Sequence, residues 1–206
     1  MNKIKYIAAA LVAVAALGFQ QAKADIYSFD LNVGNSAISG FSGPYANVSI
    51  NRTSSTTANV TLTAYAGFLV GAAQAGDFNV NASSWSISNL AFNGTSISNG
   101  GSSNADGFGV FNQTFDAFDG FTNAGTTLSF TLTGGAGTNW LSAMQVLIAN
   151  AGGWLAAAHI FVIGNSSIVT GFAAGNGGSV PDGGATVMLL GMGLGALGMV
   201  RRYLIG

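Results

Sequence analysis

The chain has 206 residues, a formal net charge of −1 at pH 7 and only 6% charged residues. It contains no cysteine, which excludes disulfides, thiolate catalysis and cysteine metal sites. Lys23 is its last lysine, so the rest of the chain lacks the basic surface that a nucleic-acid partner would need. The polar residues are mainly Asn, Ser, Thr and Gly, which make a neutral, hydrogen-bonding surface.

The first 24 residues have the plan of a secretory signal peptide. Lys3 and Lys5 give the segment a positive start, and residues 7–19 form an uncharged apolar stretch. Ala22 and Ala24 then supply the small side chains that fit a peptidase cleft. We therefore expect signal peptidase to remove residues 1–24, so that Asp25 begins the mature protein. A retained N-terminal anchor is the alternative, but the apolar stretch is shorter than the roughly 20 residues of a spanning helix.

Period-two alternation of apolar and polar side chains comes next and predicts half-buried antiparallel strands. It covers residues 26–33, 48–50, 59–65, 85–92 and 128–132. Clusters of Gly, Asn and Ser separate these segments and predict turns at 40–44, 93–107 and 134–139. These features predict a mainly β ectodomain over residues 25–174, folded as an antiparallel β-sandwich, of which the jelly roll is one form.

One segment departs from this alternation. Residues 140–150 predict a short amphipathic helix, because apolar residues fall near i, i+3, i+6 and i+7: Leu141, Met144, Leu147 and Ile148. Residues 157–163 predict a further strand, and residues 175–179 form a glycine-rich spacer.

The ectodomain offers few groups for chemistry. Its one local cluster of carboxylates is Asp106, Asp116 and Asp119. Because Ca²⁺ takes carboxylate and carbonyl oxygens from loops, these three residues are calcium candidates. The alternative is that they are loop residues between aromatic core residues, and we favour it because no calcium-loop motif of the EF-hand or repeat type is present.

The histidine and the tryptophans have two interpretations each. His159 has no second histidine or cysteine with which to bind zinc, so a structural place in a strand is favoured over a general base. We expect no catalytic residue in the chain and no cofactor, with calcium as the one candidate left open. Trp85, Trp140 and Trp154 either line a sugar-stacking face or pack in the core, and we expect at least two of them in the core.

The C-terminal residues 180–206 combine three features in a fixed order. A short motif is followed by an uncharged apolar segment and a basic pair: Val180, Pro181, Asp182, Gly183 and Gly184, then 183–200, then Arg201 and Arg202. At 1.5 Å per residue the apolar segment reaches about 27 Å, just short of a hydrocarbon core of about 30 Å. It predicts a marginal transmembrane helix with cytoplasmic arginines, and a plain tail anchor after a Pro-Asp-Gly turn is the alternative.

This arrangement resembles the PEP-CTERM class of protein-sorting signals in its VPDSG/VPDGG variant. The resemblance implies recognition by an exosortase, an integral membrane enzyme, in a diderm bacterium with an exopolysaccharide or biofilm matrix. Asp182 and Gly183 depart from the commonest Pro-Glu-Pro form of the motif. Segments at 129–132, 140–143 and 157–160 also look like ectodomains found with such tags.

Together these features predict an exported protein that is held transiently in the inner membrane and then reaches the cell surface or extracellular matrix. We expect its role there to be non-enzymatic. The alternative is a carbohydrate-binding module acting in the exopolysaccharide layer. Exposed aromatic residues in a row on one sheet face would favour that alternative, whereas buried aromatics would favour the structural role.

Overall fold

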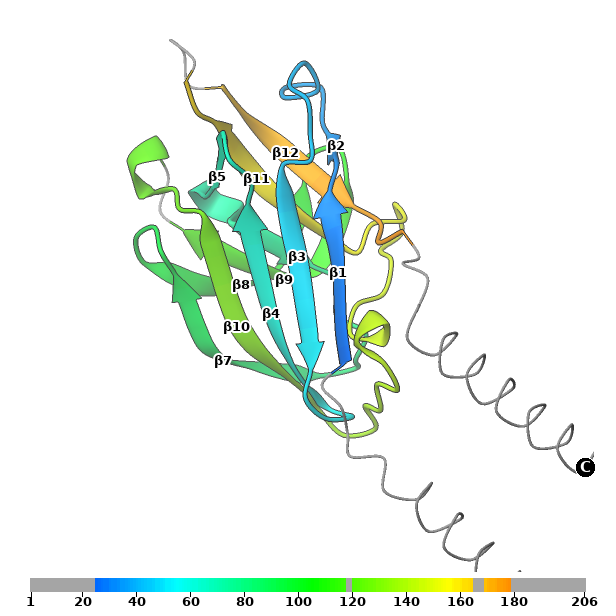
Figure 1. Ribbon diagram of the computed structural model, residues 1–206. Coiled ribbons are helices and arrows are strands. Elements are labelled where there is room, and N and C mark those ends of the chain that lie inside the picture. The colour runs from blue at the N-terminus through cyan, green and yellow to red at the C-terminus, as the bar shows by residue number, and fades with distance from the viewer. Residues whose placement is uncertain (1–24, 118–119, 165–168, 179–206) are drawn as a thin grey trace, which may run out of the picture.

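The computed structural model describes residues 25–117, 120–164 and 169–178. Within these ranges the chain forms two antiparallel β-sheets packed face to face, and its helical content is limited to short 3-10 turns (Figure 1). The prediction of a mainly β body is therefore confirmed. The signal segment over 1–24 and the transmembrane helix predicted over 183–200 lie outside the described residues.

The first sheet, sheet A, has five strands in the order β1-β3-β4-β10-β7 and forms the front layer of Figure 1. In chain order its strands are β1 (Asp25–Leu31), β3 (Ala46–Arg52), β4 (Thr57–Ala64), β7 (Trp85–Phe92) and β10 (Thr127–Gly134). Their alternation matches the sequence pattern, because Val60 and Leu62 are fully buried while Thr61 and Thr63 point to the other face.

The second sheet, sheet B, has seven strands in the order β2-β12-β11-β6-β9-β8, with β5 also paired to β11. They are β2 (Val33–Gly34), β5 (Phe68–Val70), β6 (Gly76–Phe78), β8 (Ile97–Ala105), β9 (Gly109–Ala117), β11 (Ala156–Val162) and β12 (Val169–Gly175). Three 3-10 turns connect strands of the body: η1 (Ala72–Gln74), η2 (Phe121–Asn123) and η3 (Ala143–Gln145).

The main core lies between the two sheets. Phe78 and Phe115 of sheet B meet Phe130 of sheet A, with ring centroids 5.1 and 4.5 Å from that of Phe130. Such offset and edge-on ring contacts add about 0.5–1.5 kcal/mol each beyond the area that the rings bury. The two sheets are thus held together by direct side-chain packing, as in a β-sandwich.

A smaller core covers the outer face of sheet B. Ala157 of β11 and Ala174 of β12 point away from the main core, since their neighbours Ala156, Ala158 and Ala173 belong to it. Phe108 and Phe111, from the turn end of the β8–β9 hairpin, pack with these two alanines. The small alanine side chains therefore let this end of the hairpin lie across the sheet.

The turn cluster predicted over 93–107 is wrong in part, because β8 runs through it from Ile97 to Ala105. Its residues are mostly Ser, Asn and Gly, which have low intrinsic preference for strands. Pairing with β9 nevertheless imposes the strand, with register shifts between Asn99 and Ser103. Gly101 has φ 74°, a backbone conformation that favours glycine, within this irregular stretch.

The amphipathic helix predicted over 140–150 is also wrong. The segment contains only the 3-10 turn η3, and Leu141, Met144 and Ile148 are exposed. Its backbone pairs instead with the segment after β6: Asn81 N–H donates to Val146 O at 3.0 Å, and Ile148 N–H donates to Asn79 O at 2.9 Å. These long-range bonds replace the i→i−4 bonds that a helix would have made.

Candidate functional site

The described body begins at Asp25, the residue at the predicted signal-peptide cleavage site. Its Oδ2 accepts a hydrogen bond of 2.5 Å from Ala143 N–H and lies 3.6 Å from Arg52 Nε. Asp25 is also paired with Arg52 in the β1–β3 ladder. The side chain at this position is therefore part of the fold, whereas Ala22 and Ala24 lie outside the described residues.

We expect protein extracted from the cell surface to begin at Asp25, because Ala22 and Ala24 supply the small side chains of the cleavage site. N-terminal sequencing should give Asp-Ile-Tyr. An Ala24→Leu variant should retain residues 1–24, since leucine is too large for the peptidase cleft, and an Ala24→Ser variant should be cut normally. Recovery of intact Met1 from the surface fraction would contradict the prediction.

The calcium candidates do not form one described cluster. Asp106 lies in the turn between β8 and β9, where its Oδ2 accepts a 3.2 Å hydrogen bond from Asn35 Nδ2. Asp116 lies at the far end of β9, roughly 23 Å along the strand from Gly109 at about 3.3 Å per residue. Asp119 lies outside the described residues. Among the described residues, no three His, Asp or Glu side chains lie close enough together to hold a metal ion. The favoured interpretation of these aspartates as loop residues and the calcium alternative both stay untested.

One buried carboxyl group was not singled out by the sequence analysis. Asp77 is fully buried in β6, and Thr114 Oγ1 donates a 2.8 Å hydrogen bond to its Oδ1. Within the described residues its Oδ2 has no hydrogen-bond partner. The pKa of Asp77 is raised to about 8, chiefly by burial. The hydrogen bond from Thr114 lowers this pKa, and the negative charge of Asp116 raises it further.

His159 lies in the middle of β11, an interior strand of sheet B, as the strand predicted over 157–163 requires. Its ring stacks on Phe172 of β12 at a centroid distance of 4.7 Å and on Phe161 at 5.4 Å. Its Nε2 also shares a hydrogen bond with Thr170 Oγ1. These contacts, with Phe161 on the same strand and with Thr170 and Phe172 on β12, place the imidazole in the packing of the outer face of sheet B.

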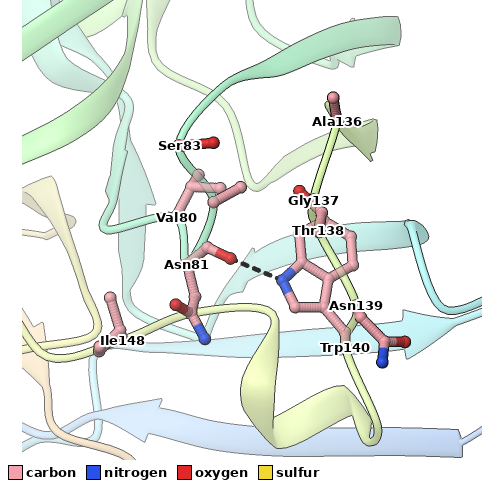
Figure 2. Close-up of a pocket in the computed structure, with 10 residues that line it drawn as sticks. Val80, Asn81, Ser83, Ala136, Gly137, Thr138, Asn139, Trp140 and Ile148 are labelled. Carbon is pink, nitrogen blue, oxygen red and sulfur yellow. Dashed lines mark hydrogen bonds between the residues drawn. The ribbon is translucent and has the colours of Figure 1, made fainter.

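A pocket of about 500 Å³ lies beside Trp140, at the turn that follows β10 (Figure 2). Trp140 is only 2% exposed, and its Nε1 donates a 2.8 Å hydrogen bond to Asn81 O. Asn139 and Thr138 continue the wall on one side, and Ile148 lies on the other. The residues that line the pocket carry no titratable group, so it offers hydrogen bonds and an apolar wall but no acid or base.

The other two tryptophans are partly buried. Trp85 packs against the main core and donates from Nε1 to Gln113 Oε1 at 2.9 Å, while Trp154 meets Phe108 edge-on in the smaller core. Among the described aromatic residues, Tyr65 is the one with a large exposed fraction, 39%. The described surface therefore lacks the row of exposed aromatics that would favour a carbohydrate-binding module, and Tyr65 is the single exposed ring that it offers.

Tyr65 belongs to a polar pocket of about 410 Å³ at one edge of sheet A. Asp30 Oδ1 accepts two 2.8 Å hydrogen bonds there, one from Tyr65 Oη–H and one from Asn47 Nδ2. The hydrogen bond to Asp30 is the main cause of a raised pKa of the Tyr65 phenol. This three-residue cluster combines an aromatic ring, an amide and a carboxylate at the surface.

The C-terminal end of the body lies against β1. β12 includes Gly175, the first residue of the predicted spacer, and Gly175 O accepts a 3.0 Å hydrogen bond from Leu155 N–H. Gly177 has φ 63°, and a Cβ there would clash with the Tyr27 hydroxyl, so glycine is required at this position. The described chain continues to Gly178, two residues before Val180.

Residues 179–204 match the family model described as the VPDSG-CTERM motif. The chain carries a C-terminal sorting motif of the PEP-CTERM type. This match confirms the resemblance that the order of motif, apolar segment and arginines predicted. Neither the curated proteins nor the solved structures include a match to the chain.

The VPDSG-CTERM motif begins directly after the last described residue of the body, Gly178. Gly183 stands where the name of the motif has serine. The residues predicted to be recognised (Val180, Pro181, Asp182, Gly183 and Gly184) and the arginines Arg201 and Arg202 lie outside the described residues. Across the three described ranges, no helix has the length and apolar character to cross a membrane.

Proposed function

We propose that the protein is an exported substrate of an exosortase, which cuts it at or beside the VPDSG-CTERM motif. Signal peptidase would first remove residues 1–24, and the apolar segment 183–200 would then hold the chain in the inner membrane until the cut releases it to the cell surface or extracellular matrix. The single observation that carries this proposal is the family match over residues 179–204.

The chemistry of the tail supports this role. Proline restricts its own φ and disfavours a helical conformation of the residue before it, so the Val180-Pro181 sequence favours the extended backbone that a processing enzyme needs. The apolar segment is barely long enough to span a membrane and is followed by only a short basic end. A segment of this kind suits temporary residence in a membrane better than permanent anchoring.

The proposal gives the body a non-enzymatic role. Its described titratable side chains are distributed over different parts of the fold, and three of them have structural contacts there. Asp25 bonds to Ala143, Asp77 is buried beside Thr114, and His159 stacks between aromatic rings. The outward face of sheet A is built largely from Ser, Thr and Asn, which suits a neutral surface component.

A double substitution in the motif, Pro181→Ala with Asp182→Ala, should abolish release of the protein. Neither residue lies in the apolar segment 183–200, so membrane insertion should be unchanged while recognition is lost. The variant should therefore accumulate at full length in the membrane fraction. Mass spectrometry of the native released protein should show a C-terminus that lacks Arg201 and Arg202.

An Asp106→Ala variant is the matched control, because it removes a carboxylate from the β8–β9 turn and leaves the motif intact. It should be released like the native protein. A released native protein that still ends at Gly206 would show that the segment is a plain tail anchor and that the sorting proposal is wrong.

A further inference from the structure

The outward face of sheet A presents rows of mainly hydroxyl and amide side chains across strands β1, β3, β4 and β10. Cross-strand pairing sets three rows: Asp30, Asn47, Thr63 and Thr127; Ser28, Ser49, Thr61 and Ser129; and Ile26, Asn51, Asn59 and Thr131. Asp30 is the one charged residue in these rows, and it lies at the end of the first. The face is therefore suited to a ligand that is neutral and rich in hydrogen-bonding groups.

The polar pocket opens at this charged end of the face. It is lined by Ser28, Asp30, Asn32, Asn47 and Tyr65 of sheet A and its loops, and by Asn176 of the chain that follows β12. Side chains from distant parts of the sequence thus converge on one cavity of about 410 Å³, which lies within the usual size of small-ligand sites.

The hydrogen bonds inside the pocket fix its chemistry. Tyr65 Oη–H and Asn47 Nδ2 both donate to Asp30 Oδ1, and Asn47 Nδ2 also donates to Phe29 O at 3.3 Å. These bonds hold the three side chains in place before any ligand arrives. They also leave Asp30 Oδ2 as a carboxylate oxygen that can accept hydrogen bonds from ligand hydroxyls, and such charge-assisted bonds are roughly twice as strong as neutral ones.

The ring of Tyr65 supplies the apolar part of the site. With 39% of the residue exposed and its hydroxyl tied to Asp30, the ring is an immobilised platform beside the carboxylate. A pyranose has an apolar face that fits an aromatic ring and a hydroxyl edge that fits a carboxylate and an amide. The rows of Ser, Thr and Asn continue from the pocket along the sheet and would receive further sugar units.

We propose that the pocket formed by Asp30, Asn47 and Tyr65 binds a neutral, pyranose-containing glycan. The negative charge of Asp30, with no cation in the three rows, disfavours an anionic glycan by direct repulsion. This inference goes beyond the sorting function and does not depend on it, because the pocket belongs to the folded body.

Affinity electrophoresis tests the proposal. The protein is purified from the producing cells, from whichever fraction holds it, so that the result does not depend on removal of the tail. Its migration is compared in native gels without polysaccharide and in gels that contain dextran, a mixed-linkage β-glucan, a galactomannan or the anionic polysaccharide alginate. We expect retardation by at least one neutral polysaccharide and none by alginate.

Matched variants assign the binding to the pocket. Tyr65→Ala and Asp30→Asn should each weaken the retardation at least tenfold, as judged from the polysaccharide concentration needed for half the effect. Tyr65→Phe, which keeps the ring but loses the bond to Asp30, should weaken it less. Asp106→Asn makes the same carboxylate-to-amide change in the β8–β9 turn and should bind like the native protein.

Unchanged circular dichroism and melting temperature in these variants would show that the fold is intact. The proposal is overturned if all three neutral polysaccharides leave the migration unchanged, if alginate retards the protein equally, or if Tyr65→Ala binds as well as the native protein. If the released protein lacks the C-terminal tail and any of these binding results is obtained, the glycan site is rejected and the sorting proposal is unaffected.

Discussion

An Asp77→Asn variant should be more stable than the native protein at alkaline pH and should lose most of the pH dependence that Asp77 imposes. Asp77 is fully buried, and its pKa is raised to about 8 chiefly by burial. Ionisation of this carboxyl inside the body is costly because Thr114 is the one described side chain that donates a hydrogen bond to it. Asparagine has nearly the same shape and remains neutral.

The direction of the effect follows from proton binding. In the unfolded chain Asp77 has a pKa of about 3.9, so between about pH 4 and pH 8 the folded protein holds a proton that the unfolded chain releases. The free energy of unfolding of the native protein should therefore fall as pH rises through this window, by up to about 1.4 kcal/mol per pH unit, and level off above the folded pKa. The neutral amide of the Asp77→Asn variant contributes no such slope.

Urea unfolding at pH 5, 7 and 9 measures this difference. At pH 5 the variant should equal or fall slightly below the native protein, because the amide group has no described partner at the position of Asp77 Oδ2. At pH 9 it should be more stable by several kcal/mol. Asp106→Asn, in the β8–β9 turn, is the control and should follow the native profile. Parallel native and Asp77→Asn profiles would contradict a raised pKa.

Alternation in the sequence predicted the strands of sheet A because each of them has one face in the main core. Val60 and Leu62 are buried and Thr61 and Thr63 are not, as their spacing required. The same reasoning missed β6, which is only three residues long and is buried on both faces. It also missed β8, whose Ser, Asn and Gly residues become a strand through pairing with β9 and not through their own preference.

The pocket at Asp30 shows a second limit of local pattern. Asp30 and Tyr65 lie in the alternating segments 26–33 and 59–65, but neither segment carries information about the other. The β1–β3 register sets Asp30 opposite Asn47, and the chain after β4 then brings Tyr65 within 2.8 Å of the same carboxylate. Because register is fixed by the packing of whole strands, this meeting of three residues was outside what spacing along the chain could predict.

The predicted helix and the observed structure of segment 140–150 bury different residues, which are direct neighbours in the sequence. A helix with an apolar side at Leu141 and Met144 predicts that these residues are buried. The structure instead buries Trp140 and Ala143 and exposes Leu141 to 70%. Substitution by alanine should therefore lower the free energy of unfolding strongly at Trp140 and little at Leu141, whereas the predicted helix would require a strong loss at Leu141.

Trp140→Ala should lower the free energy of unfolding by about 3–5 kcal/mol, the range for removal of a large buried aromatic side chain. Trp140 is 2% exposed and belongs to the main core, so alanine would leave a cavity beside the wall shown in Figure 2. The substitution would also remove the donor to Asn81 O, which lies 2.8 Å from the indole nitrogen. Urea unfolding at a fixed pH gives the measurement.

Leu141→Ala is the matched control and should change stability by no more than about 0.5 kcal/mol, because this side chain lies at the surface. Trp140→Phe keeps most of the buried ring but leaves Asn81 O without its donor, so a loss of about 1–3 kcal/mol is expected, and the variant remains measurable if alanine prevents folding. An amphipathic helix would give the reverse order, with the larger loss at Leu141. That outcome would reject the extended pairing of this segment with the chain after β6.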